Sequence, residues 1–200
     1  MQTANTHGQH PEDPTLPPHG RTAGTGITVR PAGPEDAEGI YEVVSGSMKL
    51  YCRNSGVEPD KLDAVSETIE DVRTAIITVP VFIGVDSDGS ILGSVRLLSK
   101  KISSFGTSGL AGILSLSPDD SVSYFSRFAV REDLHGKGVG SLLYRAAEEK
   151  ARETRSEYIL LHTSLLNPVL VAFYERRGFV LLFEDYSRGY PRGLFGKKLG

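Results

Sequence analysis

The sequence has one cysteine, no tryptophan and no long apolar run among its 200 residues. Because Cys52 has no second cysteine to pair with, an intrachain disulfide and a cysteine-based metal site are excluded, which is typical of a reducing cytoplasm. No apolar stretch reaches the ~18 residues of a membrane span, and the N-terminus lacks the pattern of a signal peptide. A net charge of −3 and a pI of about 6.0 argue against a general nucleic-acid or membrane-surface binder. We therefore expect a cytoplasmic protein with no metal, nucleic-acid or membrane partner.

The first 26 residues are poor in apolar side chains and rich in proline, threonine and glycine. Such a segment cannot bury enough apolar surface to offset the conformational entropy lost on ordering. We expect residues 1–26 to be a disordered tail and residues 27–200 to form one domain. His7, His10 and His19 in this tail could bind a metal, but their wide spacing favours the absence of a site.

Two helix patterns follow a short strand pattern at the start of the domain. Pro34 suits the first turn of a helix whose apolar stripe runs over 40–48. A second stripe, over 62–76, predicts a helix that Asp60 caps. The residues between them, 49–59, are expected to form a loop.

A β-hairpin is predicted next. Asp88-Gly89 lies between the apolar runs 81–85 and 91–98, and this dipeptide is typical of tight hairpin turns. Residues 99–120 are rich in serine and glycine, so we expect either a mobile loop over the substrate site or a plain surface connection.

Glycines cluster after the next strand pattern, which covers 121–130. Gly136, Gly138 and Gly140 open an amphipathic helix pattern. Glycine tolerates positive φ and lets the backbone come close to a ligand, so successive amides can form a concave anion site. The following helix adds its unpaired N–H groups and the positive end of its dipole. The stretch therefore predicts a phosphate-binding turn.

Three kinds of glycine-rich phosphate loop compete for this stretch. The P-loop pattern, G-x-x-x-x-G-K-[ST], is not present. The dinucleotide fingerprint G-x-G-x-x-G differs from the spacing here, and Glu157 opens the next strand pattern instead of closing it. The third kind, [RQ]-x-x-G-x-[GA] after a strand that ends in Ala-Val, fits with one departure, since His135 stands at its first position.

The remaining patterns complete an α/β domain. Residues 158–161 form a nearly unbroken apolar run, as in a strand that is covered on both faces. Asn167 is a good N-cap, and Pro168 fits the first position of a short helix. Two further strands are predicted at 179–184 and 193–199, joined by a turn.

Two segments carry a resemblance to one family. Residues 127–130 (Arg-Phe-Ala-Val) with 135–140 (His-Gly-Lys-Gly-Val-Gly) match the pyrophosphate loop described above. Residues 167–179, N-P-V-L-V-A-F-Y-E-R-R-G-F, are similar to N-x-x-A-x-x-F-Y-x-x-x-G-F, with the alanine one place later at Ala172. In these motifs and in the order of its elements, the chain resembles the GCN5-related N-acetyltransferases (GNAT) over residues 27–199.

The resemblance implies a GNAT fold: a mixed, mostly antiparallel, twisted sheet of six to seven strands with about four helices, splayed at the strand that ends at Val130. It implies direct transfer of an acyl group, acetyl above all, from acetyl-CoA as co-substrate to a primary amine of a small molecule or a protein. The Val130 N–H would stabilise the oxyanion, and Tyr174 would act as the general acid on the departing thiolate. The residues implied to bind acetyl-CoA are Phe128, Ala129, Val130, His135, Gly136, Lys137, Gly138, Val139, Gly140, Ser141, Asn167 and Tyr174.

The general base is not evident. The acceptor amine must lose a proton, because an unperturbed lysine-like amine has a pKa near 10.4. Many relatives place a glutamate on the long strand, where this chain has Tyr124. A water relay, Glu132, Asp119 and Asp120 are the alternatives. His162 lies in an apolar strand, which is more typical of a core histidine than of a base.

Two other functions stay open. A module that binds acyl-CoA without catalysis would explain the missing glutamate and His135, whereas Tyr174 argues against it. A toxin that acetylates aminoacyl-tRNA would need a basic patch. The candidates for such a patch are Arg188, Arg192, Lys197 and Lys198.

The acceptor itself is unknown. The segments 34–76, 99–120 and 184–193 are expected to select it. The acidic net charge mildly favours a cationic or amine-bearing acceptor. A homodimer is left open.

Overall fold

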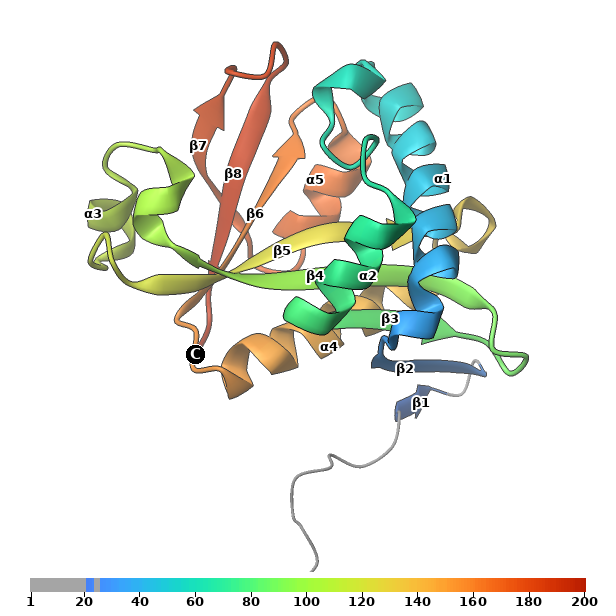
Figure 1. Cartoon of the computed structure of the whole chain (residues 1–200). Helices are drawn as coiled ribbons and strands as arrows, with labels where there is room; N and C mark the ends of the chain where they lie inside the picture. The colour runs from blue at the N-terminus through green and yellow to red at the C-terminus, as the bar shows by residue number, and fades with distance from the viewer. Residues whose placement is uncertain (1–20, 24–25) are drawn as a thin grey trace, which may run out of the picture.

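The computed structural model describes residues 21–23 and 26–200, and Figure 1 shows one open β-sheet with helices packed on it. The strands are β1 (Arg21–Ala23), β2 (Ile27–Pro31), β3 (Val81–Val85), β4 (Ile91–Lys101), β5 (Ser121–Val130), β6 (Tyr158–Ser164), β7 (Val180–Asp185) and β8 (Arg192–Lys198). The helices are α1 (Ala37–Ser55), α2 (Ile69–Thr78), α3 (Leu110–Leu114), α4 (Val139–Glu153) and α5 (Pro168–Glu175). The strand order is β1-β2-β3-β4-β5-β6-β8-β7, and only β5 and β6 pair in parallel among the described strands.

The expected mixed, mostly antiparallel sheet is confirmed, with eight strands and five α-helices among the described residues. The strand beyond the expected number is β1, which pairs with β2 although it falls in the segment expected to be a disordered tail. Residues 1–20 and 24–25, with the three tail histidines, lie outside the described residues. The helix beyond the expected number is α3.

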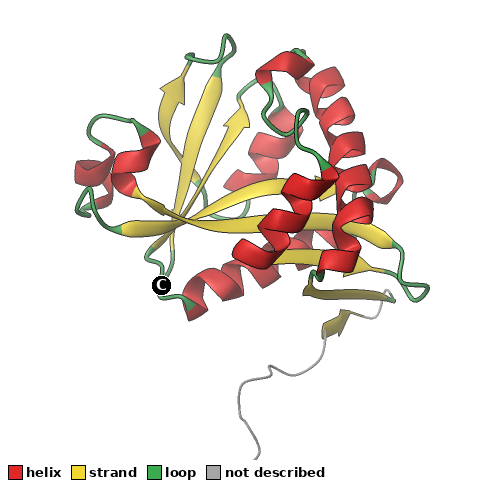
Figure 2. Ribbon diagram, viewed as in Figure 1, coloured by secondary structure: helices red, strands yellow, loops and turns green. Residues whose placement is uncertain are grey.

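Helices cover both faces of the sheet, with α1 and α2 on one face and α4 on the other (Figure 2). Ile40 of α1 and Val72 of α2 are buried in one apolar cluster with Ile83 of β3. Leu143 of α4 is buried in a second cluster with Val95 of β4. Each helix therefore buries one apolar stripe against the sheet and leaves its polar side in water.

The first helix is longer than expected. α1 continues to Ser55, through much of the segment 49–59 that was expected to be a loop. Leu50 extends its buried face by more than one turn, so burial outweighs the low helix propensity of Gly46. The helix ends at Gly56, which takes the left-handed conformation (φ 65°) of a C-terminal cap.

The second helix begins later than expected. The stripe over 62–76 predicted a start near Asp60, but α2 begins at Ile69. Thr68 is its N-cap: Thr68 Oγ1 accepts from the Asp71 N–H at 3.2 Å, and Asp71 Oδ2 accepts from the Thr68 N–H at 2.8 Å. This capping box fixes the helix start. Residues 61–64, which precede it, line a cavity instead.

The segment 99–120 is not the plain loop that its composition suggested. Strand β4 runs to Lys101, and α3 forms within the segment. Ile102, Leu110 and Leu114 are buried in a third apolar cluster with residues of β5, β6 and β8. This packing ties the segment to the C-terminal half of the sheet.

The expected splay of the sheet is confirmed. β5 and β6 pair only at Ser123 with Ile159 and at Tyr124 with Leu160. Beyond Tyr124 the two strands diverge, as Figure 1 shows, so the last residues of β5 have no partner strand on that side within the described part of the chain.

A β-bulge lies in β5 just beyond the point of divergence. The register between β4 and β5 shifts between Ser94 and Arg96. Arg127 takes a left-handed backbone conformation there (φ 49°), which is unfavourable for a residue with a side chain. Such strained residues gather at functional sites, and Arg127 lines the cavity described next.

Candidate active site

The predicted phosphate turn connects β5 to α4. Gly136 (φ 78°) and Gly138 (φ 90°) take left-handed conformations, and Gly138 is the N-cap of α4. A Cβ atom added to Gly140 would lie 3.1 Å from Cζ of Phe128, so glycine permits the close approach of α4 to β5. The first backbone N–H groups of a helix of 15 residues are thereby placed beside the open end of β5.

Two side chains brace this turn. His135 Nε2 lies 3.1 Å from the Val130 carbonyl oxygen, so the residue that departs from the family motif ties the turn to β5. Arg177 donates from Nη2 to Ser141 Oγ at 2.7 Å, and its guanidinium carbon lies 3.5 Å from the centre of the Phe173 ring. Arg177 therefore adds a cation near the first turn of α4.

The backbone N–H of Val130 points into the gap between β5 and β6. The Arg131 N–H donates to the Leu92 carbonyl at 3.0 Å, and the preceding residues Val130 and Gly93 face each other. Hydrogen-bonded and non-hydrogen-bonded pairs alternate along an antiparallel ladder, so Val130 and Gly93 form a non-hydrogen-bonded pair. The Val130 N–H is therefore directed away from β4. The side chain of the preceding residue, Ala129, is buried in the apolar cluster beneath α1.

Tyr174 lies in α5, within the segment 167–179 that resembles the second family motif. Its side chain is 4 % exposed and packs edge-on against Phe125 and Phe179, with ring centres 6.1 and 5.6 Å apart. Burial raises the pKa of the Tyr174 phenol well above its usual value, so the phenol keeps its proton at neutral pH. Asn167 caps the same helix, since its Oδ1 accepts from the Leu170 N–H at 3.2 Å.

Two adjoining cavities of about 160 and 380 Å³ open beside Tyr174 and the free edge of β5. The smaller cavity is bounded by Tyr174, Phe128 and Tyr51. The larger is bounded by Lys100 and Phe105, among others. Both cavities share the lining residues Asp63, Tyr124, Ser126, Arg127, His162, Arg188 and Arg192. All three segments expected to select the acceptor supply wall residues.

His162, expected as a core histidine, is partly buried and also lines both cavities. Its Nδ1 lies 3.0 Å from the Tyr124 hydroxyl. Burial, followed by the positive charge of Arg192, lowers the pKa of His162 to about 4, so the imidazole is neutral at pH 7. The apolar strand pattern around this residue indicated a side chain in the core. Because β5 and β6 diverge, this position of β6 forms part of a cavity wall.

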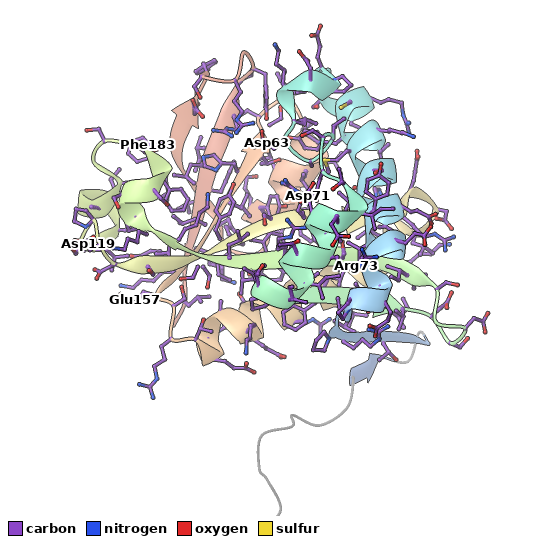
Figure 3. All side chains as sticks on the ribbon, in the orientation of Figure 1. Asp63, Asp71, Arg73, Asp119, Glu157 and Phe183 are labelled. Carbon is purple, nitrogen blue, oxygen red and sulfur yellow. The ribbon has the colours of Figure 1, made fainter. Side chains whose placement is uncertain are left out.

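The three carboxylates considered as bases lie elsewhere. Glu132 is 64 % exposed and pairs with Arg53. Asp119 is 85 % exposed and pairs with Lys101, at the outer edge of the molecule beside α3 (Figure 3). Asp120 accepts from the Ser117 N–H. None of the three lines either cavity.

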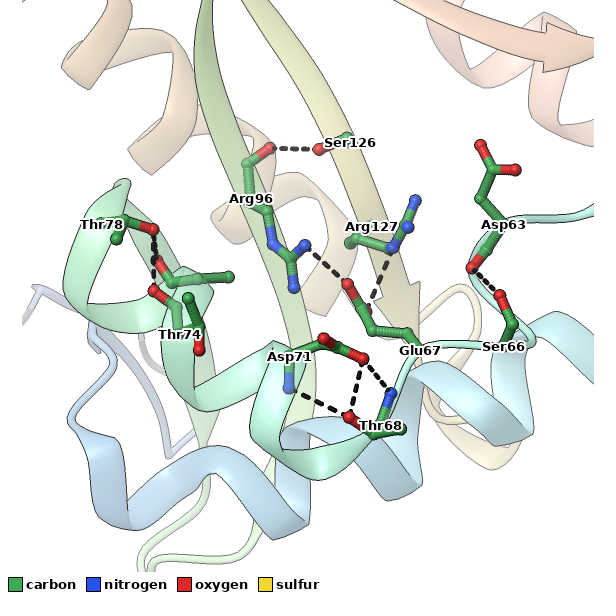
Figure 4. Close-up of polar contacts among 11 residues, drawn as sticks. Asp63, Ser66, Glu67, Thr68, Asp71, Thr74, Thr78, Arg96, Ser126 and Arg127 are labelled. Carbon is green, nitrogen blue, oxygen red and sulfur yellow. Dashed lines mark hydrogen bonds and ion pairs between the residues drawn. The ribbon is translucent and has the colours of Figure 1, made fainter.

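Ion pairs fasten the cavity walls to one another. Glu67, 8 % exposed, accepts from Arg96 Nη1 at 2.8 Å and from Arg127 Nε at 3.2 Å, as Figure 4 shows. It therefore joins the segment before α2 to β4 and β5. Arg188 donates from both terminal nitrogens to Asp63, at 2.6 and 2.8 Å, and joins the same segment to the turn before β8.

The basic residues considered as a tRNA-binding patch do not gather on one surface. Arg188 and Arg192 line the cavities. Lys197 instead contacts Glu148 and Tyr144 of α4.

Among residues 21–23 and 26–200, no group of three His, Cys, Asp or Glu side chains is arranged to hold a metal ion. None of the helices in this part of the chain combines the length and apolar character that a membrane crossing requires.

The comparisons with known proteins agree with this geometry. The family model for the acetyltransferase (GNAT) family matches residues 57–179. No curated protein sequence matches the chain significantly.

Among solved structures, the PaiA N-acetyltransferase from Thermoplasma acidophilum in complex with coenzyme A has a TM-score of 0.68 at 18% identity, covering 86% of this chain and 99% of that one. A GNAT-family acetyltransferase from Listeria monocytogenes has a TM-score of 0.66 at 20% identity, covering 90% of this chain and 100% of that one. Identities this low show the fold alone, whereas the family match spans more than half of the sequence, and the chain therefore belongs to the GNAT acetyltransferase family.

Proposed function

We propose that this protein is an N-acetyltransferase that transfers the acetyl group of acetyl-CoA directly to a primary amine. One observation carries the proposal: the glycine turn, the outward N–H of Val130 and the Tyr174 side chain all border the gap where β5 and β6 diverge. Membership of the family supports the same reaction.

The glycine turn fits a pyrophosphate. Left-handed glycines direct successive amides into one concavity, and the start of α4 adds the positive end of the helix dipole. The backbone from Gly136 to Ser141 would hold the pyrophosphate, with His135 fixing the turn and Lys137 exposed beside it. The unpaired edge of β5 at Phe128 and Val130 would accept the pantetheine arm as an added strand. Asn167, buried at the start of α5, would border that arm.

Two groups would act on the thioester. The Val130 N–H, which is free of β4, would donate to the carbonyl oxygen as negative charge develops on it. Tyr174, kept protonated by burial, would donate its phenolic proton to the departing sulfur. Acetyl-CoA supplies the activated acyl group in this arrangement.

We infer that Tyr124 and His162 replace the missing glutamate. The amine attacks only in its neutral form, so the bound ammonium must lose a proton. The Tyr124 oxygen would take that proton while its own proton moves to Nδ1 of His162, 3.0 Å away. The imidazole is neutral at pH 7, but its pKa of about 4 makes it a weak base, so the proton would have to pass on from the imidazole to water in the cavity.

Isothermal titration calorimetry with acetyl-CoA and with CoA tests the proposal. We expect micromolar binding by the wild type and none by Gly138→Glu, because the new side chain puts bulk and negative charge into the turn. Gly109→Glu is the matched control, because Gly109 is also an exposed, left-handed glycine (φ 85°) at a helix N-cap, but in α3. Equal affinity in wild type and Gly138→Glu would refute the assignment of the turn.

A second measurement separates catalysis from binding. Release of free CoA thiol is followed with a panel of amines at saturating acetyl-CoA. Turnover with any amine supports the transferase, whereas tight binding without turnover across the panel would favour the binding-module alternative.

A further inference from the structure

The larger cavity is lined by cations in a protein whose net charge is −3. These cations come from separate elements, namely β4, β5, β8 and the turn before β8. The lining cations are Arg96, Lys100, Arg127, Arg188 and Arg192, and Asp63 is the one carboxylate in the described wall. The positive charge is thus concentrated in this cavity, although the net charge of the protein is negative. The cationic acceptor that the net charge mildly favoured does not fit such a cavity.

The surrounding carboxylates do not balance these cations. Glu67 is shared between Arg96 and Arg127, while Asp63 pairs with Arg188. Asp185 pairs with Arg192. Five cations therefore meet three carboxylates, which leaves a net excess of two positive charges among the described residues.

Lys100 contributes one of these charges. Its Nζ lies 4.6 Å from the ring centre of Tyr124 and 5.6 Å from that of Phe105. No carboxylate of the described residues lies within 4.0 Å of it. The ammonium is thus held at the cavity wall by aromatic faces, with hydrogen-bond donors to spare.

Buried donors in the same wall also lack partners. Among the described residues, Arg96 Nε and Arg192 Nε are buried without a hydrogen-bond partner, and so is the Thr163 hydroxyl in the wall of the smaller cavity. Leaving a buried donor unpaired costs about 1–3 kcal/mol, and more for a charged group. Anionic oxygens are the ligands that satisfy a fork of guanidinium donors best.

We propose that the larger cavity binds the anionic group of the acceptor, so that the acceptor is a small amine that carries a carboxylate or a phosphate. This inference rests on the proposed function. The amine would lie in the smaller cavity, between Tyr124 and Tyr174, and the anionic group would lie against Arg96, Lys100 and Arg192 in the larger one. The cations would thus orient the acceptor and exclude polyamines by like-charge repulsion.

The first test compares matched acceptors. With acetyl-CoA, kcat/KM is measured for phosphoethanolamine against ethanolamine, for β-alanine against β-alaninamide, and for putrescine. We expect the anionic member of at least one pair to exceed its neutral partner at least tenfold and putrescine to be the poorest acceptor; which pair responds separates phosphate from carboxylate. Equal or better use of the neutral or cationic amines would overturn the inference while leaving the transferase proposal intact.

The second test uses adjacent lysines on β4. Lys100→Gln removes a cavity cation without breaking an ion pair, and Lys101→Gln removes the same charge from the next residue, which is exposed and pairs with Asp119. We expect the KM of the preferred anionic acceptor to rise about tenfold in Lys100→Gln, with the KM of its neutral analogue unchanged. Lys101→Gln should behave as the wild type. Equal KM values in both variants would count against the cavity assignment.

A third measurement does not depend on turnover. Thermal unfolding is followed with inorganic phosphate or succinate against chloride at constant ionic strength. We expect phosphate or succinate to stabilise the wild type and Lys101→Gln more than Lys100→Gln. Equal stabilisation of all three proteins would overturn the inference, even if some amine is acetylated. A larger effect on the wild type would support it, even if no amine in the panel is a substrate.

Discussion

Replacing Glu67 by glutamine should weaken the fold and strengthen anion binding at the same time. Glu67 is 8 % exposed and holds Arg96, which is 12 % exposed, and Arg127, which is 25 % exposed. The substitution removes the charge that both guanidinium groups face and leaves two cations side by side.

The expected loss of stability follows from this burial. Removing one partner of a fully buried ion pair costs about 3–5 kcal/mol. Because both arginines retain some contact with water, we expect a smaller loss, about 2 kcal/mol in the free energy of unfolding. For a domain of this size, that loss corresponds to a fall of about 4–8 °C in melting temperature.

Urea unfolding, with and without 20 mM phosphate at constant ionic strength, measures both effects. The liberated guanidinium groups should bind phosphate more tightly, so phosphate should restore more stability to Glu67→Gln than to the wild type. Glu70→Gln is the control, because Glu70 pairs with Arg73 at the exposed surface of α2 and should cost at most about 0.5 kcal/mol. A loss below about 0.5 kcal/mol in Glu67→Gln, or the same phosphate effect as in the wild type, would refute the reasoning.

Three further predictions concern the tyrosines and the cavity histidine. Tyr174→Phe should lower kcat at least tenfold with little change in the Kd of CoA measured by calorimetry. An unchanged kcat would mean that Tyr174 only packs in the core and donates no proton. Tyr124→Phe should slow turnover most at pH 7 and progressively less toward pH 9.5, as the acceptor amine loses its proton without help; a deficit independent of pH would argue against the relay. His162 has a pKa lowered from 6.5 to about 4 in the folded protein, so the unfolded chain binds the proton first as pH falls, and stability is lost between those values. Urea unfolding should therefore show the wild type losing about 2 kcal/mol more between pH 7 and pH 5 than His162→Gln, and equal losses would contradict the shift.

The sequence predicted the fold where local pattern and long-range packing agree. The strand 121–130, the glycine turn and the start of α5 at Pro168 were found where spacing and capping residues placed them. The start of α2 was missed because Leu62 lies at helical spacing from the later apolar residues although it lines a cavity. The capping box at Thr68 was the local signal that could have corrected this.

The larger cavity could not be predicted from the sequence. Its cations come from β4, β5, β8 and a turn, at positions that look like ordinary polar residues within alternating strands. Glu67 and Asp63 meet arginines that are 29 and 125 residues away in sequence, and only the fold brings those pairs together. The position of Tyr124 in place of a glutamate was visible, but its hydrogen bond to His162 depends on the parallel pairing of β5 with β6.

That short parallel contact also bears on how the molecule holds together. Only two residue pairs link β5 to β6, so the ladder hydrogen bonds divide the sheet into a β1–β5 half and a β6–β8 half. The halves are natural units of local opening, and amide hydrogen exchange should report different protection for each of them. A co-substrate that adds a strand to β5 and contacts α5 would couple the two halves. Binding of acetyl-CoA would then stabilise the two halves together, so that they open as one unit and not separately.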